Sequence, residues 1–356
     1  MNFIKIQKRH FSNFSFAIVG SGPAGFFTSK HLLKKVENVT IDFYEKLPHP
    51  FGLVRNGVSP DHQDVKKVIS DFSQILENKN VKFFGNVEVG KDIKLQELQR
   101  NYSGVILSYG ADGENLLDLE NENKIGCFSA RNFVNWYNGH IKHSNDSDIN
   151  KIDFSRVKDV VIIGNGNVAI DVARLLAKEE KDLRHLDIPE HVLDRLRNSS
   201  LKNIHIVARR GLMQAAFTIK EVRELSKIPG INLVVLKEEI ENSLNERSLE
   251  ELDSTIPAER RHLERKIEFV KKFIILDKYD QKTFIHYLKI RRNVFFRFIL
   301  APSEIHVDRL PDSSGKVDAI SLNKTRLVGK TFSQTIERIP NEIETIQTIL
   351  IFKSIG

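Results

Sequence analysis

Residues 16–27 read FAIVGSGPAGFF, a short apolar run that ends in a glycine-rich turn. The run predicts a buried strand, the segment from Pro23 to Val36 predicts a helix, and VTIDFYE (39–45) predicts a second strand. A glycine turn between a strand and a helix of a β-α-β unit is the pattern of a dinucleotide-binding fold.

The first turn has a physical reason for each of its glycines. Gly20 permits the tight bend, Gly22 lets the backbone approach a pyrophosphate, and Gly25 lets helix and strand pack closely. The helix start offers N–H groups to that pyrophosphate. Glu45, at the end of the second strand, can accept hydrogen bonds from ribose hydroxyls and would repel a phosphate. The alternative is that these glycines serve packing alone.

A second turn lies in VVIIGNGNVAID (160–171), where Ala169 replaces the third glycine. The next predicted strand, NIHIVARRG (203–211), ends in Arg209 and Arg210, where an acid would favour a free ribose. A guanidinium grips a phosphate through two hydrogen bonds, so the pair favours a ribose that carries a phosphate. The contrast between the two turns points to two dinucleotides, most simply FAD and NADPH. The alternative is a solvated basic pair.

Composition narrows the class of protein. A chain of 356 residues with 40% hydrophobic and 28% charged residues is typical of a globular protein of about two domains. Its single cysteine, Cys127, excludes an internal disulfide, a dithiol relay and an iron–sulfur cluster of its own, and no metal site is predicted. The net charge of +7 is typical of proteins that meet nucleic acid, an anionic membrane or an acidic protein partner. No nucleic-acid motif accompanies it, and a solvated basic surface is the alternative.

The amino-terminal segment, residues 1–14, is basic and lacks acids. Ile4, Phe11 and Phe14 fall near one face at helical spacing. These features are typical of a mitochondrial transit peptide, and a frayed basic tail is the alternative. No apolar run reaches the roughly 18 residues that a membrane span needs.

The rest of the chain predicts two dinucleotide folds in series. Further strands are expected over 81–89 and 104–111, and an acidic, polar stretch near 112–125 looks like a crossing between domains. Residues 240–292 read as helices and surface loops, and 296–307 and 319–329 read as antiparallel strands.

Several long segments resemble one family. They include VGSGPAGFFTSKHLLK, YEKLPHPFGLVRNGVSPDH, FSARNFVNWYNG, VIIGNGNVAIDVAR and QAAFTIKEVREL. They resemble the mitochondrial adrenodoxin reductase family of NADPH–ferredoxin reductases, from about residue 16 to the end of the chain. The resemblance implies an α/β fold of two Rossmann-like domains, an FAD domain with an inserted NADP domain. The expected domains are 15–113 for FAD, 114–345 for NADP, and 346–356 as a strand returning to the FAD domain.

The resemblance also implies an activity. NADPH gives a hydride to FAD, and the reduced flavin passes electrons one at a time to an acidic [2Fe–2S] ferredoxin. The expected protein is a monomer of the mitochondrial matrix; peripheral contact with the inner membrane is left open.

Matching positions carry roles only as the resemblance implies them. The expected FAD contacts, the turn glycines included, are Gly20, Gly22, Ala24, Gly25, Glu45, Leu53 and Val89. The expected NADPH contacts are Gly164, Asn165, Gly166, Asn167, Val168, Arg209, Arg210 and Glu221. His62 and Asp171 match residues considered for proton handling. Arg223, Arg260, Arg261 and Arg265 match a face that meets ferredoxin, with a solvated helix face as the alternative.

One departure from the family concerns the carboxyl end. The family continues with a Gly-Trp strand and a Gly-Pro turn that return to the FAD domain, and the only tryptophan here is Trp136. We therefore expect a truncated chain that lacks part of the FAD domain, and a nucleotide-binding remnant without catalysis is an alternative function. A second alternative resembles the small subunit of glutamate synthase, whose cysteine-rich cluster motifs are absent here.

Overall fold

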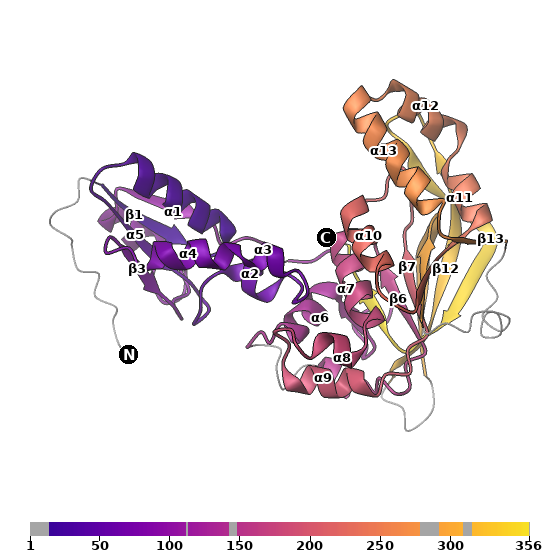
Figure 1. Ribbon diagram of the computed structural model, residues 1–356, viewed down its shortest axis with the longest axis horizontal. Helices are drawn as coiled ribbons and strands as arrows, with labels where there is room; N and C mark the ends of the chain where they lie inside the picture. The colour runs from indigo at the N-terminus through magenta and orange to yellow at the C-terminus, as the bar shows by residue number, and fades with distance from the viewer. Residues whose placement is uncertain (1–13, 112, 142–147, 278–291, 309–314, 356) are drawn as a thin grey trace. The chain divides into compact units, whose positions relative to one another are not determined.

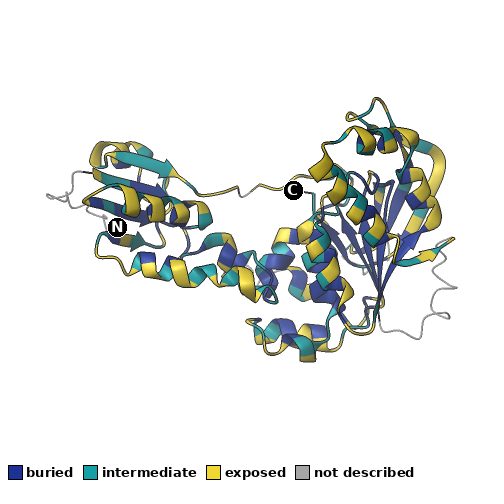
Figure 2. Cartoon of the chain, turned by 45° about the horizontal axis from the view of Figure 1, so that its top comes forward, coloured by how far each residue is buried: buried dark blue, intermediate teal, exposed yellow. Residues whose placement is uncertain are grey.

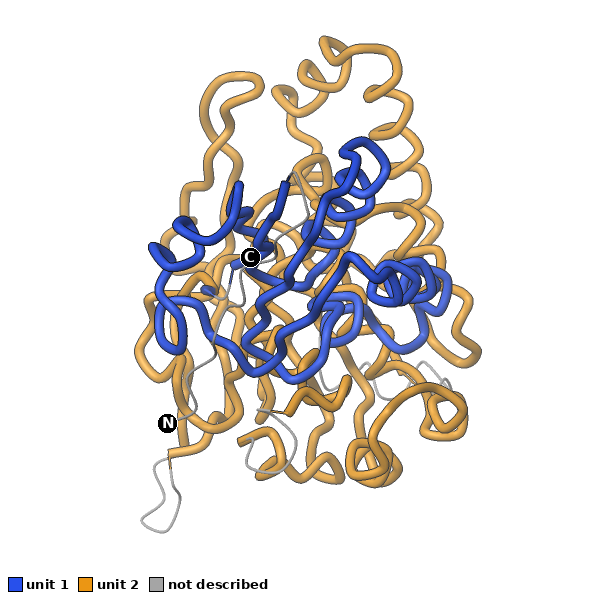
Figure 3. Tube along the Cα trace, turned by 90° about the vertical axis from the view of Figure 1, so that its left-hand side faces the viewer, with its two compact units in different colours: residues 1–113 blue, residues 114–356 orange. Residues whose placement is uncertain are grey.

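The structure is a computed structural model that describes residues 14–111, 113–141, 148–277, 292–308 and 315–355. The predicted transit peptide lies outside the described residues, except for Phe14. The chain divides into two compact units, Met1–Gly113 and Glu114–Gly356 (Figure 3). Each unit contains its own buried hydrophobic clusters. Among the described residues, every helix is too short or too polar to cross a bilayer.

The first unit contains nine helices and strands in its described part. They are β1 (Phe14–Val19), α1 (Pro23–Lys35), β2 (Val39–Tyr44), α2 (Gly52–Asn56), α3 (Gln63–Lys66), α4 (Val68–Leu76), β3 (Val81–Phe84), α5 (Leu95–Asn101) and β4 (Gly104–Leu107).

A parallel sheet of order β3-β2-β1-β4 forms the centre of this unit (Figure 1). On one face, Phe26 of α1 stacks against Phe43 of β2 and Phe72 of α4, with ring centroids 4.8 and 4.6 Å apart. All three aromatic rings are fully buried. Their packing fixes α1 on the sheet and thereby fixes the turn from which α1 starts.

The second unit is longer. Its first part contains β5 (Cys127–Ser129), α6 (Ala130–Tyr137), the 3₁₀ helix η1 (Asp148–Lys151), β6 (Asp159–Ile163), α7 (Asn167–Ala177), α8 (Glu180–Leu183), α9 (Glu190–Arg197), β7 (Asn203–Val207) and α10 (Ile219–Ser226). Its second part contains β8 (Ile231–Leu236), α11 (Lys237–Ser243), α12 (Glu246–Ser254), α13 (Pro257–Val270), β9 (Ile274–Leu276), β10 (Arg292–Arg297), β11 (Leu300–Val307), β12 (Val317–Val328), β13 (Thr335–Gln347) and β14 (Ile351–Lys353).

This unit has three layers. A seven-stranded parallel sheet of order β5-β14-β6-β7-β10-β8-β9 forms the middle, and its central strands are buried (Figure 2). Val160 and Ile162 of β6 belong to the core under helices that include α6, α7 and α10, whereas Val161 and Ile163 face the core under the antiparallel sheet β11-β12-β13. A strand buried on both faces reads as a continuous apolar run, as residues 160–163 do. The predicted α/β class with two Rossmann-like units is confirmed.

A row of polar side chains crosses four strands of the large sheet. Asn232 donates to Asn293 at 3.0 Å, Asn293 to Asn203 at 3.1 Å, and Asn203 to Asp159 at 2.9 Å. The residues are direct neighbours in the register of β8, β10, β7 and β6. Because a slipped strand would leave buried amides without partners, this row favours a single register.

Three expectations need correction. Residues 351–353 do not return to the first unit; β14 pairs with β5 and β6 inside the large sheet. Residues 296–297 end a central parallel strand, β10, before the antiparallel β11 begins. The strand expected over 81–89 stops at Phe84, and Val89 forms only an isolated bridge with Ile93.

Candidate functional site

The first glycine turn lies between β1 and α1. Gly20 has a φ of +96°, and its N–H donates to the Tyr44 carbonyl at 2.8 Å. A Cβ at Gly20 would lie 2.5 Å from the Cα of Tyr109, and one at Gly25 would lie 2.6 Å from the Gly20 carbonyl oxygen. Both positions therefore require glycine, one for the bend and one for close packing.

Gly22 differs from these two because a Cβ there would meet nothing within 4 Å. It caps α1 in an extended conformation, without a side-chain capping bond, and Pro23 follows at the first helical position. The backbone is thus open to an approaching ligand at a helix end that favours anions.

Glu45 lies at the carboxyl end of β2 and is 8% exposed. Its Oε2 accepts hydrogen bonds from the Ser21 N–H at 2.9 Å and the Ser21 hydroxyl at 2.8 Å, and its Oε1 accepts from the Leu47 N–H at 3.0 Å. The protein therefore fixes this carboxylate beside the glycine turn. A carboxylate offers about four acceptor sites, which leaves capacity for a ligand hydroxyl. Ser21 was not singled out from the sequence.

A cavity of about 400 Å³ lies at this edge of the first sheet, within the size range of ligand pockets. Gly20, Glu45 and Val89 line it, together with residues such as Tyr109. Four predicted FAD contacts lie outside its lining: Gly22 and Gly25 of the turn, and Ala24 and Leu53, which are exposed.

The second turn repeats the first between β6 and α7. Gly164 has a φ of +112°, its N–H donates to the Val207 carbonyl at 2.8 Å, and a Cβ there would collide with the Ser354 carbonyl oxygen. Gly166 caps α7 in an extended conformation, and a Cβ there would meet nothing within 4 Å. Asn165 is half-buried and Val168 is exposed, while Ala169 is fully buried where a third glycine would pack.

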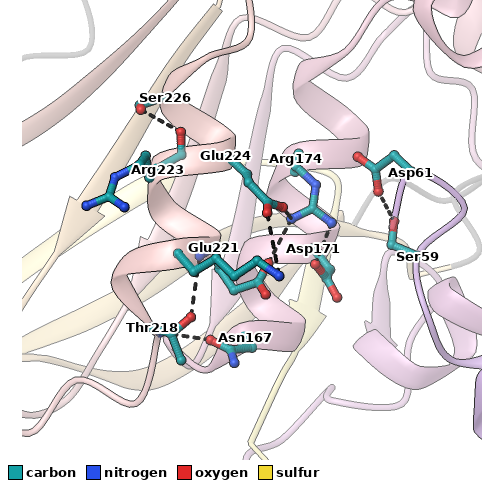
Figure 4. Close-up of polar contacts among 11 residues, drawn as sticks. Ser59, Asp61, Asn167, Asp171, Arg174, Thr218, Glu221, Arg223, Glu224 and Ser226 are labelled. Carbon is teal, nitrogen blue, oxygen red and sulfur yellow. Dashed lines mark hydrogen bonds and ion pairs between the residues drawn. The ribbon is translucent and has the colours of Figure 1, made fainter. Parts of the chain in front are cut away.

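The starts of α7 and α10 are joined by polar contacts. The Thr218 N–H donates to Asn167 Oδ1 at 2.9 Å, and the Glu221 N–H donates to the Thr218 hydroxyl at 3.4 Å. Three residues from segments far apart in the sequence, two of them predicted NADPH contacts, therefore lie at one place (Figure 4).

Arg174 links two further predicted residues. Its guanidinium is 2% exposed and contacts Asp171 at 2.6 Å and Glu221 at 3.1 Å (Figure 4). Glu224 lies at 4.0 Å from the same group. The buried cation therefore holds carboxylates of α7 and α10 in a fixed arrangement. Arg174 was missed from the sequence, although its place three residues after Asp171 on a predicted helix was a signal.

Arg209 and Arg210 follow β7 after a single residue, Ala208, and both side chains are exposed. Within the described part of the chain neither guanidinium makes an ion pair. Their backbone is fixed, because the Thr325 hydroxyl donates to the Arg209 carbonyl at 2.9 Å and the Ile299 N–H donates to the Arg210 carbonyl at 3.2 Å. Two cations are therefore held on an ordered backbone at the carboxyl end of a strand, where parallel sheets bind ligands.

The predicted docking arginines are unequal. Arg223 is exposed on α10 and lies 5.7 Å from the ring centre of Phe269 on α13. Arg260 pairs with Asp253 at 3.0 Å and Glu264 at 2.9 Å, so its charge is compensated locally. Arg261 and Arg265 are exposed. His62 is the N-cap residue of α3 in the first unit, and its role stays a prediction.

Comparison with known proteins places this geometry in a family. The pyridine nucleotide-disulphide oxidoreductase family matches residues 14–239. NADPH:adrenodoxin oxidoreductase of Salvelinus fontinalis is 39% identical over 341 residues, which cover 95% of this chain and 64% of that protein. The Bos taurus protein of the same name is 49% identical over 213 residues, covering 60% of this chain and 42% of that protein.

A solved structure is similar over nearly the whole chain. Mycobacterium tuberculosis FprA in complex with NADPH matches with a TM-score of 0.81 and 32% identity, covering 96% of this chain and 70% of that chain. The chain spans 64% of the length of its Salvelinus fontinalis relative. By the match of its family model, the chain belongs to the pyridine nucleotide-disulphide oxidoreductase family, and most of its length is similar to NADPH:adrenodoxin oxidoreductases.

Proposed function

We propose that this protein is an NADPH-dependent flavoprotein that passes electrons through FAD to a [2Fe–2S] ferredoxin, one at a time. One observation carries the proposal: a buried carboxylate, Glu45, stands beside the first glycine turn, and two exposed guanidiniums, Arg209 and Arg210, stand beyond the second. The first favours a free ribose and the second a ribose phosphate.

The residues at the first turn fit FAD. Gly22 leaves room for a pyrophosphate at the start of α1, and Gly20 and Glu45 line the cavity of about 400 Å³. Glu45 is held by three donors of the protein and accepts from the ribose hydroxyls with its remaining lone pairs. Bound FAD would supply hydride acceptance and single-electron donation, chemistry that no side chain provides.

The residues at the second turn fit NADPH. Gly166 leaves the start of α7 open to the pyrophosphate, and Asn167 joins that start to α10. Arg209 and Arg210 bind the 2′-phosphate. Glu221 contacts the bound NADPH, and Arg174 fixes the positions of Glu221 and Asp171 through its ion pairs with both. Asp171 and His62 handle protons.

The acceptor is an acidic ferredoxin, and three observations support this. The relatives carry adrenodoxin in their names, the chain has a net charge of +7, and Arg223 stands exposed on α10. Opposite charges speed the encounter between such partners. The relatives are also named mitochondrial, and we propose a monomer in the matrix, with or without peripheral contact with the inner membrane.

Reconstitution of the full chain tests the proposal. We expect purified protein to bind FAD and to reduce cytochrome c only when NADPH and an acidic [2Fe–2S] ferredoxin are both present. Replacing Arg209 and Arg210 by alanine narrows the preference for NADPH over NADH, since each charged hydrogen bond contributes about 1.5–3 kcal/mol. A preparation that binds NADPH but takes up no FAD would support the nucleotide-binding remnant instead.

A further inference from the structure

We propose that Thr325 of β12 is a positioning residue for Arg209 and Arg210, so that selectivity for a 2′-phosphate depends on a hydroxyl that touches no ligand. The inference deepens the proposed function and rests on its assignment of the two arginines. It concerns a residue more than a hundred positions away in the sequence and in a different sheet.

Two hydrogen bonds fix the carbonyl groups of consecutive arginines. The Thr325 hydroxyl donates to the Arg209 carbonyl at 2.9 Å, and the Ile299 N–H donates to the Arg210 carbonyl at 3.2 Å. The Thr325 N–H donates in turn to the Ile299 carbonyl at 2.7 Å. Thr325 therefore holds the first arginine directly and the second through Ile299.

Thr325 differs from the two arginines in burial, and this difference explains why its backbone contact matters. Thr325 is 0% exposed, whereas both arginine side chains lie in solvent. A long exposed side chain is placed by its backbone, because little else packs against it. Phosphate recognition by guanidinium needs both donors aligned, so a rotated peptide at Arg209 would lose contacts even though the charge stays.

The backbone at Ile299 and Thr325 departs from regular geometry in two ways. Ile299, 4% exposed, has a φ of +52°, a conformation that β-branched residues rarely adopt. The pairing of β12 with β13 shifts register between Asn323 and Thr325. Both irregularities lie at the residues that hold the arginine carbonyls, and such departures from regular geometry concentrate where a site must be held in shape.

A buried residue with two ion pairs, Arg297, fixes the backbone next to Arg209. Arg297 is 0% exposed, and its guanidinium contacts Glu239 at 2.6 Å and Glu344 at 2.7 Å. Its carbonyl accepts from the Ala208 N–H at 2.9 Å, and the Ala208 carbonyl accepts from the Leu300 N–H at 3.0 Å. The residue before Arg209 is therefore fixed on both sides, which leaves Thr325 to set the orientation of the next peptide.

Calorimetric titration of the full chain with adenosine 2′,5′-bisphosphate and with 5′-AMP tests the inference, because the two ligands differ only in the 2′-phosphate. We expect Thr325→Val to raise the Kd for the bisphosphate about three- to tenfold, the effect of losing one hydrogen bond behind a charged contact. The Kd for 5′-AMP should stay within about twofold, and Thr325→Ser should restore tight binding of the bisphosphate. If the valine variant does not fold, Thr325→Ala removes the same hydroxyl.

Two control variants frame the result. Thr345→Val removes another hydroxyl of the same sheet, which lies 3.0 Å from the Ser321 hydroxyl, and should leave both Kd values unchanged. The variant with alanine at positions 209 and 210 should lose the preference for the bisphosphate, which establishes the arginines as its source.

Three results would overturn the inference. An unchanged preference in Thr325→Val, beside a lost preference in the double arginine variant, contradicts the positioning role and leaves the proposed function intact. Equal weakening of both ligands means that the hydroxyl supports only the fold. Equal affinity of the unchanged protein for both ligands refutes the proposed NADPH site together with this inference.

Discussion

Replacing Arg174 by methionine tests how much the buried ion pairs of this residue stabilise the second unit. Methionine keeps most of the volume of the arginine stem and removes the guanidinium. The variant leaves Asp171 and Glu221 close together, without the cation that now contacts them at 2.6 and 3.1 Å. We expect the free energy of unfolding to fall.

The structure sets the size of the loss. Removing one partner of a buried ion pair costs about 3–5 kcal/mol, because the remaining charge stays buried without compensation. Asp171 and Glu221 keep 16% and 14% of their side-chain surface exposed, so water relieves part of this cost. We therefore expect about 3 kcal/mol, the lower end of the range.

The chain contains its own probe for this measurement. Trp136 is the single tryptophan, it is fully buried, and it lies in the same unit as Arg174. Its fluorescence during denaturation with urea reports the unfolding of that unit. Arg184→Met is the matched control: Arg184 is 64% exposed, and its partner Glu180 keeps a second cation, Arg197 at 3.5 Å, so this change should have little effect.

A second substitution sharpens the test. Glu221→Gln removes one of the carboxylate charges that Arg174 contacts, so the double variant should recover part of the lost stability. A single variant as stable as the unchanged protein would refute the reasoning, and so would a double variant that loses as much as the two single changes added together.

Three further predictions follow from the same contacts. Arg223→Ala should weaken reduction of ferredoxin but leave NADPH-dependent reduction of a small dye intact. Arg260→Ala should change the ferredoxin reaction less, because Asp253 and Glu264 already compensate the charge of Arg260. Equal effects of the two variants on the ferredoxin reaction would contradict this ranking. Gly22→Val should fold, because its Cβ enters open space, but should lose flavin absorbance, because that space is where the pyrophosphate binds. Gly20→Ala should lower the melting temperature, because its Cβ would lie 2.5 Å from the Tyr109 backbone. The reverse pattern would contradict the roles assigned to the two glycines. Burial lowers the pKa of His205 from its usual 6.5, so the unfolded chain takes up that proton first. The neutral histidine's contribution to the free energy of unfolding is complete above pH 6.5 and is lost as the pH falls, by up to about 1.4 kcal/mol per pH unit. His205→Phe should therefore reduce the dependence of the free energy of unfolding on pH, measured by denaturation at several pH values. An unchanged pH dependence would exclude His205 as its source.

The elements around both glycine turns could be predicted from local sequence. The apolar runs of β1 and β6 end in glycines, and α1 and α7 begin directly after them. Turn, strand and helix signals all lie within about 25 residues here, so no distant contact is needed to interpret them. The exposure of Arg209 and Arg210 beyond β7 also agrees with the position expected from the motif.

Features set by distant contacts could not be predicted. The run at β14 reads as a strand, but its sequence does not say which sheet it joins, and it lies between β5 and β6. Arg174 sits in a mostly apolar helix, and one of its buried partners, Glu221, comes from another helix. The pairing of Thr325 with Arg209 joins residues 116 positions apart, with no local pattern at either end.

A crystal structure of the full chain grown with FAD and NADP⁺ tests the central claim most directly. The account predicts FAD at the first turn, with its ribose hydroxyls on Glu45, and the 2′-phosphate of NADP⁺ within hydrogen-bond distance of Arg209 and Arg210. A phosphate bound elsewhere, or one dinucleotide occupying both turns, would contradict it.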